Sequence, residues 1–202
     1  MTNANPFAQR STLEYELPPF AQIKEEHYLP AFYEGCAEHL VEVQAILDTP
    51  GAATFENTIV ALEKSGQYLG RMMRVFYNKS SSDTNDALDT IEEEIAPKLA
   101  AHQDAISLNP VLFKRIKDLY DARESLGLNI EDAWLLERYY KDLIHEGAHL
   151  TEAQRERLKE LNEELSTLET LFSKNVLADT NDLAVLVDTA EELDGLSENQ
   201  IA

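Results

Sequence analysis

Cysteine, glycine, proline and basic residues are all scarce in this sequence of 202 residues. The single cysteine, Cys36, cannot form an internal disulfide. Only 17 Lys and Arg oppose 38 Asp and Glu, and the resulting net charge of −21 disfavours nucleic acid and anionic membranes as partners. No apolar run approaches the roughly 18 residues of a membrane span, and the N-terminal residues lack the features of a secretory signal. We therefore expect a cytoplasmic protein.

The residues that are present predict a helical protein. Hydrophobic residues make up 44% of the chain and charged residues 27%, which is the balance of a folded globular protein. Between the few glycines and prolines, apolar residues recur at spacings of three and four. The predicted fold class is therefore all-α, an antiparallel helical bundle with at most one short strand near the C-terminus. Residues 183–187 are the candidate for that strand.

Turn and capping residues predict where the helices begin and end. The first helix is expected to begin at Pro30 and to end before residues 49–51, Thr-Pro-Gly. A second should run from Thr54 through Gly66 to Phe76. The turn of residues 80–84, Ser-Ser-Ser-Asp-Thr, should end this helix and cap the next, and the later helices should begin at Asn109, Asn129 and Thr151. Pro97 should kink the helix that follows Thr84.

The helix that follows Thr151 carries an apolar seam. Its members alternate at steps of three and four: Leu158, Leu161, Leu165, Leu168 and Phe172. This spacing is typical of coiled coils, so we expect the seam to pair with a neighbouring helix. The last residues, from Ser197, have the form of a helix start. We therefore expect residues 1–202 to be one helical domain of a longer protein.

One motif has the spacing of a zinc hydrolase. Residues 145–149, His-Glu-Gly-Ala-His, fit H-E-x-x-H, in which one helix face presents two imidazoles to Zn²⁺ and the glutamate deprotonates the bound water. Glu164 or Glu169 would be the third ligand. However, Gly147 suits a left-handed helix cap better than a helix interior, and Thr151 begins a capping box. A helix that ends at Gly147 would separate the two imidazoles.

We accordingly predict no catalytic, cofactor-binding or metal-binding residue in this chain. A small self-contained zinc hydrolase that uses His145, Glu146 and His149 is the alternative. Of the other reactive side chains, Cys36 lies on an apolar helix face and is expected to be an inert thiol. The acidic run 92–94 is expected to be a solvated helix face, because consecutive helical residues point in different directions.

A set of short segments spread along the chain carries a family resemblance. They are residues 26–32 (EHYLPAF), 54–59 (TFENTI), 61–66 (ALEKSG), 96–100 (APKLA), 112–113 (LF) and 161–166 (LNEELS). Together they resemble the thimet-oligopeptidase family of zinc peptidases. Residues 136–140 (LERYY) and 172–177 (FSKNVL) are most similar to its bacterial peptidyl-dipeptidase branch, whose members remove dipeptides from peptide C-termini.

This resemblance implies a function for the chain as part of a larger enzyme. In the family the zinc helix lies far downstream, and the N-terminal helices form one wall of a deep channel. Zinc, short peptide substrates and a catalytic half would thus belong to the full-length protein, and no cofactor is expected in this chain. The glycine of residues 145–149 directly follows the glutamate, whereas the family's motif has glycine before the second histidine. No catalytic residue is therefore carried over.

The function expected from the resemblance is that of the helical, channel-forming part of a cytosolic peptidase that releases C-terminal dipeptides. The chain alone should be inactive. A helical interaction module, in which the Leu158 to Phe172 seam binds a partner helix, is a further alternative.

Overall fold

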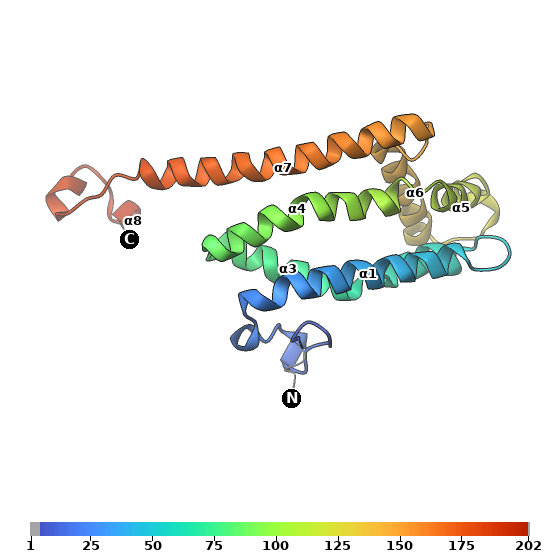
Figure 1. Ribbon diagram of the computed structural model, residues 1–202, viewed down its shortest axis with the longest axis horizontal. Helices are drawn as coiled ribbons and strands as arrows, with labels where there is room; N and C mark the ends of the chain where they lie inside the picture. The colour runs from blue at the N-terminus through green and yellow to red at the C-terminus, as the bar shows by residue number, and fades with distance from the viewer. Residues whose placement is uncertain (1–4, 202) are drawn as a thin grey trace.

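The computed structural model describes residues 5–201, apart from the side chain of residue 190. Within that range the chain forms helices, turns and irregular segments but no strand, so the all-α prediction is confirmed. Successive long helices run in opposite directions (Figure 1): α1 (Tyr28–Leu47), α3 (Gln67–Ser82), α4 (Asp86–Ser107) and α7 (Glu152–Asp182). At one end, α5 (Pro110–Asp121) and α6 (Ile130–Glu146) close the bundle.

Two hydrophobic cores hold these helices together, with the exception of α7. The first lies between α1, α3 and the first half of α4 and contains Tyr28, Phe32, Tyr68, Met72, Phe76, Leu88, Ile91 and Ile95. The second lies between α5, α6 and a single π-helical segment (Phe55–Val60), and contains Ile59, Leu112, Ile116, Leu119, Leu136 and Leu143. The α4 helix remains one helix across Pro97. The cores form because α1, α3, α4, α5 and α6 turn their apolar stripes inward.

Side-chain caps define the beginnings of α4, α5, α6 and α7. Asn109, Asn129 and Thr151 each accept hydrogen bonds from the first-turn backbone, as predicted. The cap of α4 is Asn85, one residue beyond the predicted 80–84 turn, and its Oδ1 accepts from the backbone N–H of Leu88 at 3.0 Å. The helix boundaries are thus set mainly by local polar residues.

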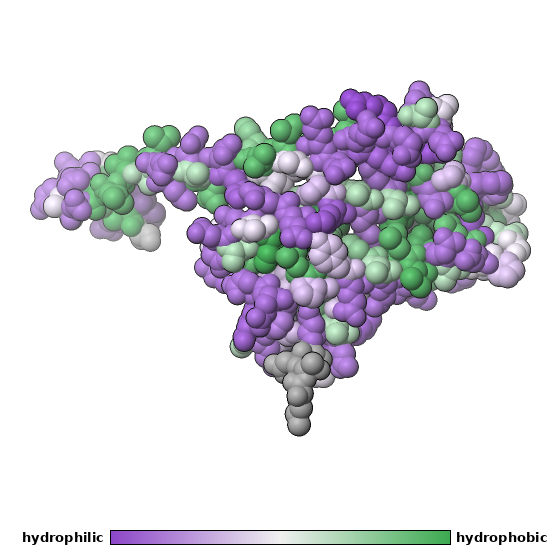
Figure 2. Space-filling model, viewed as in Figure 1, coloured by the Kyte–Doolittle hydropathy of each residue, from purple (hydrophilic) through white to green (hydrophobic). Residues whose placement is uncertain are grey.

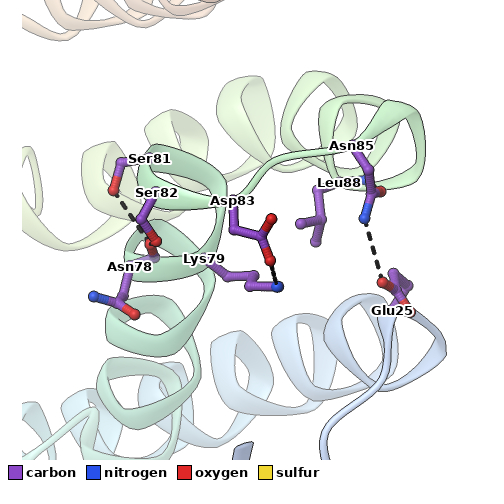
Figure 3. A network of polar contacts seen from close by, with 8 residues as sticks. All are labelled: Glu25, Asn78, Lys79, Ser81, Ser82, Asp83, Asn85 and Leu88. Atoms are coloured by element: carbon purple, nitrogen blue, oxygen red, sulfur yellow. Dashed lines mark hydrogen bonds and ion pairs between the residues drawn. The ribbon is translucent and has the colours of Figure 1, made fainter.

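The short link between α3 and α4 reverses the chain direction. Figure 3 shows Lys79, in the last turn of α3, paired with Asp83 at its end. Asn85 also reaches across to the N-terminal region, where its Nδ2 donates to Glu25 Oε1 at 3.4 Å. The side chain of Leu88 turns inward one turn later and is buried. Polar contacts therefore fix the turn, and burial fixes the helix that follows.

The predicted second helix is interrupted, which corrects the expectation of one continuous stripe. After the π-helical segment and α2 (Ala61–Lys64), the chain extends at Ser65 and turns left-handed at Gly66, where φ is +67°. The backbone N–H of Gly66 donates to Glu42 Oε2 at 2.7 Å. A Cβ at Gly66 would lie 2.9 Å from the imidazole of His39, so α1 packs where a side chain would otherwise project.

The C-terminal region also differs from the prediction. The α7 helix continues to Asp182, and residues 184–188 are irregular rather than a strand. No strand occurs anywhere in residues 5–201, so this short apolar run has no edge with which to pair. The chain then reaches α8 (Glu198–Ile201). Among the described helices, none is both long and apolar enough to cross a membrane.

Candidate functional site

The zinc-like motif lies at the end of α6. That helix ends at Glu146, and Gly147 is left-handed with φ of +96°. The backbone N–H of Ala148 returns to the carbonyl of Leu143 at 2.9 Å, which is the bond of a Schellman cap. The side chain of Leu158 on α7 packs against the glycine, and a Cβ there would lie 2.7 Å from it. The predicted left-handed cap at Gly147 is confirmed.

This cap removes the helical register on which the H-E-x-x-H spacing depends. His145 lies in the last turn of α6, whereas His149 lies beyond the left-handed residue, and both are exposed. Throughout residues 5–201, no three His, Cys, Asp or Glu side chains gather closely enough to hold a metal ion. Glu164 and Glu169 are exposed on α7. The residues present in this part of the chain therefore do not fit a catalytic zinc, and we derive no step through one.

A histidine pair links α1 to α4. His39 Nδ1 lies 3.0 Å from His102 Nε2, and His39 Nε2 lies 3.2 Å from Ser65 Oγ. Ser65 Oγ donates to the carbonyl of Leu62 at 2.7 Å, since a carbonyl can only accept. His39 Nε2 must then donate to Ser65, and His102 Nε2 must donate to His39 Nδ1. His102 Nδ1 is thereby left as a buried lone pair with no hydrogen-bond partner.

Both imidazoles are neutral in this arrangement. Burial, followed by the neighbouring His39, lowers the pKa of His102 to about 4. Burial also lowers the pKa of His39, against the opposing effect of Glu42. The two side chains are thus hydrogen-bonded structural histidines. The pairing itself was missed, because the two histidines are far apart in sequence and only the packing of α1 on α4 brings them together.

The contact between α4 and α7 is polar. Asn162 Nδ2 donates to Asp104 Oδ1 at 2.8 Å, and Lys174 Nζ lies 2.5 Å from Glu93 Oε1. Asp104 is buried, and its second oxygen has no hydrogen-bond partner. Burial raises the pKa of this carboxyl, opposed by Asn162 and by Lys159. The helix α7 thus rests on α4 through a row of polar and small side chains.

The apolar seam of α7 does not face α4, which corrects the predicted pairing. We call its exposed part the α7 apolar face: Leu161, Leu165, Leu168 and Phe172. These side chains are 44 to 69% exposed. Figure 2 shows hydrophobic residues among the polar ones along the α7 rod, and Figure 1 shows that α7 extends past the end of α4. A row of this kind is typical of a surface that another chain segment covers.

An open groove of about 380 Å³ lies beside α6, next to the second core. Trp134 is largely exposed, and the guanidinium of Arg138 lies 5.8 Å from the centre of its ring. Tyr139 Oη donates to Glu63 Oε1 at 2.6 Å, and burial followed by this bond raises the pKa of the phenol. Aromatic rings beside charged groups can bind short peptides through stacking and ion pairing.

The remaining reactive groups have structural surroundings. Cys36 is partly buried, and burial raises the pKa of its thiol to about 11, far from that of a reactive thiolate. The three carboxylates of the acidic run 92–94 do not converge on one point. Glu94 contacts Tyr33 and Lys98, whereas Glu93 contacts Lys174. The run therefore forms separate surface contacts rather than a cation site.

Comparison with known proteins gives several matches over nearly the whole chain. It is 40% identical to dipeptidyl carboxypeptidase from Escherichia coli over 202 residues, which are 100% of this chain and 30% of that protein. It is 39% identical to dipeptidyl carboxypeptidase from Salmonella typhimurium over 199 residues, 98% of this chain and 29% of that protein. Oligopeptidase A from Escherichia coli is 27% identical over 188 residues, 93% of this chain and 28% of that protein.

No family model matches the chain. The matched relatives are members of the thimet-oligopeptidase family, so the resemblance predicted from the short segments is confirmed. The identity is higher to the dipeptidyl carboxypeptidases than to oligopeptidase A, in agreement with the predicted branch. The chain spans about 30% of the length of the dipeptidyl carboxypeptidase that it matches.

Proposed function

We propose that this chain, similar over its full length to the N-terminal part of dipeptidyl carboxypeptidases, is the helical, channel-forming domain of a cytoplasmic zinc peptidase that releases C-terminal dipeptides from short peptides. The observation that carries the proposal is the 40% identity over 202 residues. Since residues 5–201 do not fit a zinc site, we assign zinc and catalysis to a separate part of a longer protein. The chain alone should then be inactive.

The α7 apolar face supports a role as one part of a larger enzyme. Its four side chains are largely exposed on a helix whose contacts with α4 include the polar pairs Asn162–Asp104 and Lys174–Glu93. Hydrophobic side chains in a row are unfavourable in water, by about 25 cal/mol for each Å² of apolar surface that could be buried. The relatives are more than three times as long as this chain, so we propose that the additional part of such an enzyme covers this face.

The groove beside α6 supports a peptide channel. Exposed Trp134 offers a flat apolar surface, and Arg138 next to it offers guanidinium N–H donors, although it is also paired with Asp142 at 3.1 Å. A peptide carries both apolar side chains and a carboxylate, and this groove has groups complementary to each. We propose that it contributes to the channel wall.

The test is a hybrid enzyme. Residues 1–202 are joined to the part of Escherichia coli dipeptidyl carboxypeptidase that follows the matched region. The hybrid is then given a tetrapeptide with a blocked amino end, once with a free carboxyl end and once with an amide. We expect dipeptide release from the free acid only, with loss of activity in a chelator and recovery on adding zinc. This chain alone should release none.

Three variants of the hybrid separate the parts of the proposal. Leu165→Glu in the hybrid should reduce activity, because it introduces a charge into the covered apolar face, while Glu164→Gln next to it should have little effect. Trp134→Ala should raise KM more than it lowers kcat, since the ring would contact peptide rather than reacting atoms. A folded but inactive hybrid would contradict the proposal. Cleavage by residues 1–202 alone, abolished by His149→Ala, would instead support the self-contained hydrolase.

A further inference from the structure

A second concave site lies away from α7, between the N-terminal segment and α3. It is an open pocket of about 560 Å³, a size common for small-molecule sites. Phe7 and Val75 line it and are buried, while Tyr15 and Phe20 line it with exposed rings. The pocket therefore offers apolar and aromatic walls that remain accessible from solvent.

Two arginines from α3 line the same pocket. Arg71 and Arg74 stand one helical turn apart, and within residues 5–201 neither forms an ion pair. Arg71 donates to the carbonyl of Phe7 at 3.3 Å, but its Nε is buried and has no acceptor. The one acidic side chain in the lining, Glu16, lies 3.6 Å from Arg10.

Such a pair of arginines is unexpected in this chain. Acidic residues outnumber basic ones by 38 to 17, so most cations have a carboxylate within reach. The lysines of α5 and α6, for example, pair with carboxylates one turn away on the same helix. Donors that the protein leaves without an acceptor beside a cavity are available to a ligand.

The pocket rim has a strained backbone. In the described part of the chain, Tyr15 and Glu16 are the non-glycine residues with positive φ, at 56° and 55°. Side chains rarely adopt this conformation, and such residues cluster at ligand-binding sites. Tyr15 also lines the pocket, and it is 88% exposed.

We infer that this pocket binds a small carboxylate that carries an apolar or aromatic body. The guanidinium groups of Arg71 and Arg74 would accept the carboxylate, since their planar donor pairs match its two oxygens. The body of the ligand would lie against Phe7, Phe20 and Tyr15. The ligand could be a free organic acid or the C-terminal end of a peptide, because both present the same chemistry.

The inference is independent of the proposed peptidase function. The pocket is lined by the N-terminal segment and α3, it shares no lining residue with the groove beside α6, and the inference needs no other part of a longer protein. A bare inorganic anion would use the arginines but leave the apolar walls in water. The class of ligand is therefore defined by the two kinds of lining together.

The test uses the chain of 202 residues and the arginine side-chain Nε–H signals in nitrogen-15 NMR spectra. The probe is hippurate, which joins a benzoyl group to a carboxylate, and its uncharged amide is the control ligand. We expect hippurate to shift the Nε–H signals of Arg71 and Arg74, and the amide to leave them unchanged. Sulfate should bind about tenfold more weakly, because it cannot use the apolar walls.

The variants are chosen so that folding is preserved. Arg74→Gln removes an exposed charge that makes no hydrogen bond within the described residues, and should weaken hippurate binding by about tenfold. Arg157→Gln makes the same change of charge on exposed α7 and should leave the affinity within about twofold.

Three results would overturn the inference: no shift at Arg71 and Arg74, equal binding of hippurate and sulfate, or equal loss in both variants. A peptide with a free C-terminal phenylalanine distinguishes the two sources of carboxylate. If it binds more tightly than hippurate, the ligand is a peptide end; if hippurate binds as tightly or more so, the ligand is a free acid. Either order of the two affinities supports a carboxylate site in this pocket, provided that the amidated peptide does not bind.

Discussion

Residues 5–150 and residues 151–201 are built from similar helices but are stabilised in different ways. The first region contains two cores with fully buried side chains such as Phe32 and Ile116. In the second region no described side chain is buried, although α7 is the longest helix. The comparison teaches that an apolar stripe shows which face of a helix is able to pack, whereas the neighbours determine whether it does.

The largest expected effect is in the packed region. Ile116 is fully buried in the second core, so Ile116→Ala should lower the free energy of unfolding by about 2 to 5 kcal/mol. Urea denaturation followed by circular dichroism measures the loss. Val111→Ala, at a largely exposed position on the same helix, should cost well under about 1 kcal/mol. Equal midpoints for both variants would contradict the described core.

The histidine pair gives the packed region a pH dependence. The unfolded pKa of histidine is about 6.5 and that of folded His102 is about 4, so between these values the unfolded state binds more protons. The free energy of unfolding should therefore fall as the pH falls through this window, by on the order of 2 kcal/mol between pH 7 and pH 5. His39 contributes in the same direction because its pKa is also lowered.

Urea titrations at pH 7 and pH 5 measure this dependence. The variant His102→Gln should lose less stability than the wild type on acidification, whereas His145→Gln, at an exposed helix end, should behave like the wild type. If wild type and His102→Gln responded equally to pH, another group would be responsible.

The polar contact between the two regions is expected to be weaker. Asn162→Ala removes the hydrogen bond to the buried carboxylate of Asp104, which should cost about 1 to 2 kcal/mol and raise the pKa of Asp104 further. Carbon-13 NMR of the carboxyl group against pH measures the shift. Asn175→Ala, exposed on the same helix, is the control. An unchanged pKa of Asp104 would show that the two side chains do not interact in solution.

The smallest effect is expected on the α7 apolar face. Leu165 is 53% exposed, so Leu165→Ala should cost less than about 1 kcal/mol in the chain of 202 residues. Urea denaturation beside Ile116→Ala gives the direct comparison. A loss as large as that of Ile116→Ala would mean that something covers this face in solution, and the contrast between the regions would disappear.

Much of the fold could be predicted because its determinants are local. The caps at Asn109, Asn129 and Thr151 and the left-handed Gly147 depend on residues within one turn of each position, so the sequence pattern identified them. The break at Gly66 depends instead on Glu42 of α1, which accepts its backbone N–H. Sequence spacing within one helix contains no information about such a contact.

The candidate sites follow the same division. The predicted glycine cap that argued against the H-E-x-x-H register is a local feature, and the structure contains this cap at Gly147. The His39–His102 pair and the Arg71–Arg74 pocket are formed by segments far apart in the chain, and neither spacing stands out in the sequence. The prediction that the Leu158 to Phe172 seam pairs with a neighbouring helix was wrong for the same reason. The helix α7 contacts α4 through Asn162 and Lys174 instead.

The polar row between α4 and α7 has a consequence for how the molecule opens. Hydrogen-bonding groups that separate in water exchange one set of partners for another, and no α7 side chain belongs to either core. The helix α7 can thus swing away from α4 while both cores remain intact. Amide hydrogens of α7 are then expected to exchange with solvent through this local opening, and those around Phe32 and Ile116 only when the whole chain unfolds. The amide hydrogens before and after about Thr151 would then differ in their protection from exchange with solvent.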